Sequence, residues 1–133
     1  MTFAHYSLLA ACLLPLFCAG LAKAGKFTTP PSVGGYDNAD PRAWLARQSG
    51  RRARANAAQA NSFEALPLFI AAVLVAHTLQ AEQAWVDALA WAFVGFRLLY
   101  IAAYVTDRPA MRSVVWLLGL LTCTALFLTP VWA

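Results

Sequence analysis

The chain has few charged residues, too few to cover the surface of a water-soluble domain. Charged residues make up 12% of its 133 residues and hydrophobic residues 61%, whereas soluble domains average about 25% charged residues. The length corresponds to one domain. Because so little polar surface is available, much of the apolar surface must face lipid, and a soluble enzyme or a nucleic-acid-binding domain is excluded.

The sequence also lacks a disulfide framework and a metal-binding motif. Its three cysteines, Cys12, Cys18 and Cys123, all fall inside apolar runs, and we interpret them as small buried hydrophobic residues. His5 and His77 are far apart in the sequence and do not have the spacing of metal ligands. We therefore expect no bound metal.

What the chain does contain is four apolar runs, each long enough to cross about 30 Å of hydrocarbon. They predict an all-α membrane protein, a bundle of four transmembrane helices over residues 3–22, 51–79, 84–105 and 110–128. The last helix is expected to end at Thr129-Pro130. The first run could instead be a signal peptide, but its lysines follow the apolar stretch, which favours an uncleaved helix.

A polar loop over residues 23–50 separates the first two predicted spans. In it, Asp40-Pro41 has the pattern of an N-cap followed by proline at the first helical position. The pattern predicts a short helix from Pro41 to Ser49 that ends at Gly50. Trp44 suits a membrane interface.

The basic residues are distributed unevenly between the gaps that separate the apolar runs. Nine of the ten lie in the first and third gaps, and none lies in the second gap or at either terminus. Because cytoplasmic loops of membrane proteins are enriched in lysine and arginine, both basic loops are expected in the cytoplasm, with both termini outside.

Two of the predicted spans each carry one polar stripe on an otherwise apolar surface. At 100° per residue, Arg54, Asn61 and Glu64 fall within about 80° of the second helix. Arg97, Tyr100 and Tyr104 fall within about 60° of the third helix. Placing a charged side chain at membrane depth costs about 2.5–3.5 kcal/mol or more, so such a residue indicates a candidate functional site.

These stripes allow two interpretations. In the first, the predicted topology brings them, together with Arg112 of the fourth helix, to one cytoplasmic leaflet, where they form a pocket for a charged ligand. In the second, they are interhelical contacts only, with Glu64 and Arg97 forming an ion pair that joins two helices. Helical spacing alone does not separate the two.

The motif Asn61-x-x-Glu64-x-x-Pro67, which follows a basic run, and the later Tyr100-x-x-x-Tyr104 resemble prokaryotic members of the MAPEG superfamily. These are membrane-associated proteins in eicosanoid and glutathione metabolism. The resemblance extends over residues 36–45, 54–69, 97–104 and 112–116. It implies a four-helix protomer, a homotrimer, and a bacterial inner-membrane location.

The resemblance also implies that glutathione binds between protomers near the cytoplasmic face. Asn61 and Glu64 would contact its backbone, with Glu64 at the amino group and Gln59 as a weaker candidate. Tyr100 and Tyr104 would line the same site, and the stripes add Arg54 and Arg97. Arg112 resembles the arginine that stabilises the thiolate, which is the nucleophile of a thiol whose ordinary pKa is about 8.5.

The expected activity is that of a membrane glutathione transferase or peroxidase. Its substrates would be hydrophobic electrophiles or lipid hydroperoxides dissolved in the bilayer. The alternative is a non-catalytic lipid-binding or scaffolding protein of the same fold. The first hypothesis requires a pocket for an anionic ligand, whereas the second requires only a groove.

Overall fold

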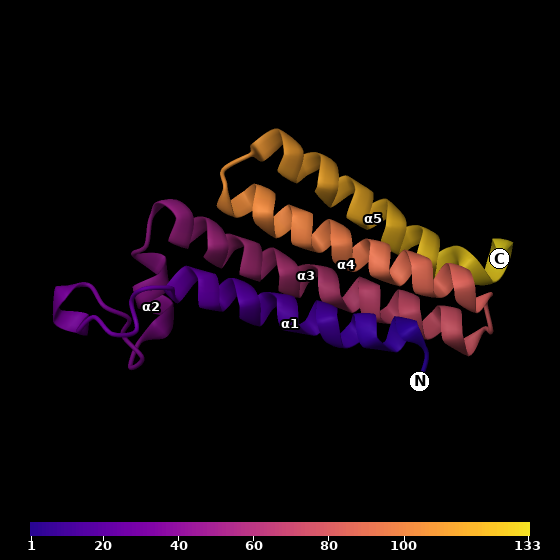
Figure 1. Cartoon of the computed structure of the whole chain (residues 1–133), viewed down its shortest axis with the longest axis horizontal. Coiled ribbons are helices and arrows are strands. Elements are labelled where there is room, and N and C mark those ends of the chain that lie inside the picture. Colours follow the sequence, from indigo (N-terminus) through magenta and orange to yellow (C-terminus); the bar gives the residue numbers. More distant parts are fainter.

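Four long helices run side by side along an elongated molecule (Figure 1). The structure is a computed structural model that describes residues 1–133. A 3₁₀ turn at Pro31–Val33 and the short helix α2 lie in the loop between the first two long helices, and there are no strands. The helices are α1 (Phe3–Lys23), α2 (Pro41–Ala46), α3 (Gly50–Thr78), α4 (Gln83–Val105) and α5 (Pro109–Trp132).

Each long helix has the length and apolarity of a membrane span. The shortest has 21 residues, which corresponds to about 31 Å at 1.5 Å per residue. Mean hydropathy over the four candidate spans ranges from 1.5 to 2.1. The predicted four-helix membrane bundle is confirmed, and the chain is an integral membrane protein.

The long helices alternate in direction, so the bundle has two distinct ends. Both chain termini and the α3–α4 turn lie at one end, which we call the terminal end (Figure 1). The loop between α1 and α3 and the α4–α5 turn lie at the other, the basic end. Helix α1 packs on α3 and α4, and α5 packs on α3 and α4, so α1 and α5 lie on opposite sides of the central pair (Figure 1).

The interior contains two apolar clusters, one toward each end. Phe69 of α3 and Phe93 of α4 stack at 4.2 Å in the cluster nearer the terminal end. The second cluster contains Ile101 and, from α3, Ala55 and Ala58. Small residues on α3 let neighbouring helices approach closely, as in other membrane helix pairs. The clusters are separated on α3 and α4 by positions that carry polar side chains.

Seven of the eight predicted span ends agree with the structure to within about one residue, but the end of the last helix was wrong. Helix α5 continues through Pro130 to Trp132 instead of ending near Leu128. Pro130 has no N–H for the Leu126 carbonyl, but the Thr129 hydroxyl donates to that carbonyl at 2.7 Å. The lost backbone bond is therefore replaced locally, and the helix continues.

The short helix begins as predicted but ends earlier. The Asp40 carboxylate accepts a hydrogen bond from the Ala43 N–H at 3.3 Å, as expected of an N-cap. The helix ends at Ala46. Beyond it, the Gln48 backbone N–H donates to the Leu45 carbonyl at 3.1 Å, and the Gln48 side-chain amide donates to the Trp44 carbonyl at 2.9 Å. Gly50, at a positive φ of 58°, starts α3 instead of terminating α2.

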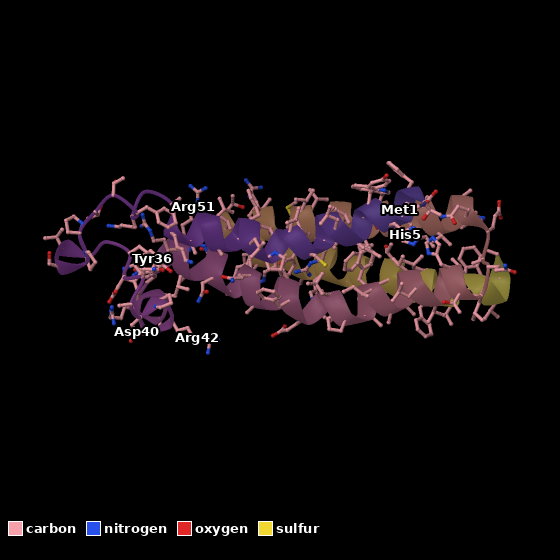
Figure 2. The ribbon with its side chains drawn as sticks, turned by 90° about the horizontal axis from the view of Figure 1, so that it is seen from below. Met1, His5, Tyr36, Asp40, Arg42 and Arg51 are labelled. Carbon is pink, nitrogen blue, oxygen red and sulfur yellow. The ribbon has the colours of Figure 1, made fainter.

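The loop at the basic end is packed around Tyr36. Its ring contacts Phe27 at 5.5 Å and Trp44 at 5.3 Å, both edge-on, and the Lys23 ammonium lies 4.7 Å from its centre. Trp44 is buried beneath this loop. Figure 2 shows Tyr36 between the loop and α2, with Arg51 on one side of this end and Arg42 on the other.

At the terminal end, two histidines that are distant in sequence meet. The rings of His5 and His77 lie 4.4 Å apart, and the Thr2 hydroxyl lies 2.7 Å from His5 Nδ1 and 2.8 Å from His77 Nε2. The Asp87 carboxylate accepts from the Ala4 N–H at 2.6 Å. These contacts join the start of α1 to α3 and α4.

Candidate ligand-binding site

Arg97 lies between the two apolar clusters, midway along α4, and is 4% exposed. Its Nη2 donates to the Ser62 hydroxyl at 3.3 Å, and its guanidinium lies 4.3 Å from the centre of the Tyr100 ring. The Ser62 hydroxyl donates its own proton to the Ala58 carbonyl at 2.8 Å, so a lone pair faces Arg97. The surrounding helices therefore orient this cation without neutralising it.

The ion pair between Glu64 and Arg97 that the sequence allowed is not present. The one ion pair in the structure joins Arg54 and Asp107. The Nε of Arg97 is buried and has no hydrogen-bond partner in the chain. An unpaired charge at membrane depth is costly. An anionic ligand that bound next to Arg97 would lower this cost by supplying the missing acceptor.

A cavity of about 170 Å³ lies between α3, α4 and α5, against Arg97. Its polar wall consists of Arg97 together with Asn61 and Glu64 of α3. The remaining wall is largely apolar and comes from all three helices: Ala65, Leu68, Phe93, Trp116, Gly119, Leu120 and Cys123. One cavity thus offers a positive group, a negative group and an amide beside a surface suited to hydrocarbon.

Asn61 and Glu64 are neighbours on one face of α3. The Asn61 side-chain amide donates to the Glu64 carboxylate at 3.2 Å, while the Asn61 Oδ1 is buried and accepts no hydrogen bond. Glu64 itself is exposed on the surface of the single chain. The pair therefore places a carboxylate at the rim of the cavity, next to an amide whose buried oxygen has no partner.

The second polar stripe continues from the cavity toward the basic end. The rings of Tyr100 and Tyr104 lie 5.7 Å apart at a steep angle. The Arg112 guanidinium lies 4.4 Å from the centre of the Tyr104 ring. Arg97, Tyr100, Tyr104 and Arg112 thus form a continuous series of cation–ring and ring–ring contacts. Neither tyrosine nor Arg112 belongs to the cavity wall.

The other two predicted site residues lie apart from the cavity. Arg54 donates from Nε to the Val105 carbonyl at 3.2 Å, and its Nη1 is 3.9 Å from the Asp107 carboxylate. It therefore holds α3 to the end of α4. Gln59 is partly buried and does not line the cavity. Of the predicted residues, only Asn61, Glu64 and Arg97 share the cavity wall.

Sequence reasoning missed Ser62 and the four residues of α5 that line the cavity. Ser62 follows Asn61 directly, but it lies on the buried side of α3 and not in the polar stripe. On α5, Trp116, Gly119, Leu120 and Cys123 recur at spacings of three, one and three residues, which places them on one helical face. That spacing was a usable signal, although most of these residues are apolar and resemble ordinary lipid-facing or packing positions.

These features define a polytopic membrane protein with a polar cavity between three of its four helices. The model of the MAPEG family matches residues 3–132, and the chain belongs to this family of membrane proteins associated with glutathione and eicosanoid metabolism. The resemblance seen in the sequence is thereby confirmed. Comparisons with curated proteins and with solved structures found no match.

Proposed function

We propose that this protein is a membrane glutathione transferase or peroxidase acting on hydrophobic electrophiles or lipid hydroperoxides. The observation that carries the proposal is the α3–α4–α5 cavity, whose wall combines Asn61, Glu64 and Arg97 with an apolar surface. Family membership supports glutathione as the co-substrate. A scaffolding protein would need no unpaired cation at this depth.

The polar wall matches the charges of glutathione, which carries one ammonium and two carboxylates. Glu64 is assigned to the ammonium, because it is the only acidic residue of the cavity. Arg97 is assigned to a carboxylate, since its Nε has no protein acceptor. Asn61 Oδ1 is free to accept from a peptide N–H. Each buried polar atom that lacks a partner in the cavity wall thus has a counterpart in the ligand.

Arg112 is assigned to the thiol. Its stacking on Tyr104 fixes the guanidinium on the polar side of the bundle, and a nearby cation favours the thiolate over the thiol. In conjugation, the thiolate sulfur forms a bond to the electrophilic carbon, and either a leaving group departs with its electron pair or the adjacent carbon takes a proton from water. In peroxide reduction, the sulfur takes the terminal oxygen, an alcohol leaves, and a second glutathione yields the disulfide and water.

A neighbouring chain is proposed to complete the site. Glu64 is exposed on the single chain although it lies midway along a membrane helix, and an ionised carboxylate facing lipid is costly. A homotrimer, as the family resemblance implies, would cover Glu64 and enclose the ligand between protomers. The proposed setting is a bacterial inner membrane, with the basic end in the cytoplasm.

The test is glutathione binding to detergent-purified protein, measured calorimetrically, followed by thiolate absorbance in the ultraviolet. Glu64→Gln should weaken binding about ten- to hundredfold, because a charge-assisted hydrogen bond contributes about 1.5–3 kcal/mol. Glu82→Gln is the matched control, since Glu82 is exposed in the turn before α4 and distant from the cavity. Equal affinities for the two variants would reject Glu64 as a ligand contact, and no binding by the wild type would reject the function.

A further inference from the structure

A second cavity, of about 160 Å³, lies at the basic end, where α1 ends and α3 begins. It is lined by Leu21 and Ala24 from the end of α1 and by Arg51 and Arg52 from the first turn of α3. None of these residues lines the α3–α4–α5 cavity. It is therefore a separate site with a strongly basic wall.

Arg52 is held in place but incompletely paired. Its Nη2 donates to the Ala24 carbonyl at 3.1 Å, which fixes the guanidinium against the end of α1. Its Nε is buried and has no hydrogen-bond partner. A buried donor without an acceptor is unfavourable, and an oxygen atom of a bound anion would satisfy it after a small rotation of the side chain.

Arg51, the adjacent residue, is exposed and extends outward from the ribbon at the basic end (Figure 2). Neither arginine takes part in an ion pair, and no acidic residue lines the cavity. The Ser49 side chain makes no cap hydrogen bond, so the first N–H groups of α3 add partial positive charge nearby. The cavity thus carries two positive charges and no compensating negative charge.

An apolar track leads away from this cavity along α1. Leu13, Phe17 and Leu21 follow one another at intervals of four residues, which places them along one face of the helix. Leu13 is 50% exposed and Phe17 is 54% exposed. The track runs from the basic end toward the middle of the span and is long enough to accompany part of a lipid acyl chain.

We propose that this cavity binds the phosphate headgroup of an anionic phospholipid at the membrane interface. Arg51 and Arg52 contact the phosphoryl oxygens, because a guanidinium offers two parallel donors that match a phosphate. One acyl chain lies along Phe17 and Leu13. A soluble phosphate has the same charge chemistry but leaves the apolar track unused. The proposal does not depend on glutathione binding.

The experiment is a lipid titration of the full-length protein in detergent, with bound lipids counted by native mass spectrometry. Dioleoyl phosphatidylglycerol is compared with dioleoyl phosphatidylcholine. We expect one phosphatidylglycerol per chain to bind at least tenfold more tightly than phosphatidylcholine. Arg51→Gln/Arg52→Gln should abolish this preference, since each lost charged contact lowers affinity about tenfold or more.

Arg42→Gln/Arg47→Gln is the matched control, because it removes the same charge from the same end. Arg42 and Arg47 are exposed and do not line the cavity. The control should retain the preference for phosphatidylglycerol. An equal loss in both double variants would mean that only the net charge of this end attracts lipid, and it would overturn the proposal.

Two further measurements keep the test decisive. The single variant Arg51→Gln preserves the contact between Arg52 and Ala24, so it should fold normally. Its affinity for phosphatidylglycerol should nevertheless fall about tenfold. Unchanged affinity in this folded variant would contradict the proposal. Inorganic phosphate at millimolar concentration should not displace the lipid. Displacement by phosphate would reassign the cavity to a soluble anion and overturn the lipid assignment.

Discussion

Replacing Arg97 by methionine should separate the stability of the bundle from its ligand binding. Methionine has a comparable length and is apolar, so it can fill the space between the two clusters without a charge. The substitution removes the hydrogen bond to Ser62 and the stacking on Tyr100. Ser62 stays satisfied, because its hydroxyl still donates to the Ala58 carbonyl.

The expected change in stability follows from the contacts that the Arg97 guanidinium makes and lacks. The Ser62 bond contributes about 1.5–3 kcal/mol and the contact with Tyr100 about 0.5–2 kcal/mol. These favourable contacts are opposed by the cost of burying the cation, which is several kcal/mol per ion. The Nε of Arg97 has no partner that would offset this cost. Replacing buried ionic groups by apolar ones is often neutral or stabilising by about 1–4 kcal/mol. We therefore expect a melting temperature that is unchanged or raised.

Glutathione affinity should fall at the same time. Loss of one contact between a guanidinium and a carboxylate predicts a decrease of about ten- to hundredfold. Melting temperature and calorimetric affinity are measured on the same detergent preparation, with Arg42→Met as a control for charge at an exposed site. A lower melting temperature with unchanged glutathione affinity would show that Arg97 is a structural residue, and it would refute the reasoning.

Three other predictions concern the thiol, the topology and the assembly. Arg112→Ala should leave glutathione affinity nearly intact but lower thiolate absorbance and the conjugation rate; a change in affinity alone would contradict its assignment. A reporter fused after Ala133 should read as external, and a cytoplasmic signal would reverse the proposed orientation. Native mass spectrometry in mild detergent should detect trimers, because Glu64 needs a cover on the lipid-facing side; monomers alone would count against the shared site.

The sequence by itself determined the number of spans and, except at the end of α5, their bounds. These properties are local, since an apolar run of about 20 residues has only one favourable way to cross a bilayer. The Asp40 cap was equally predictable, because it depends on residues three positions apart. Helical spacing also placed Asn61 with Glu64, and Arg97 with Tyr100, on shared faces. The end of α5 was missed because Thr129 replaces the bond that Pro130 cannot make.

Only the tertiary structure decided which polar groups meet across helices. Arg97 contacts Ser62 and not Glu64, α5 contributes Trp116 and Cys123 to the cavity, and Arg52 reaches the end of α1. Such contacts depend on the rotation and axial shift of each helix relative to its neighbours. Close packing of the apolar surfaces sets both, and the periodicity of a single helix does not contain them.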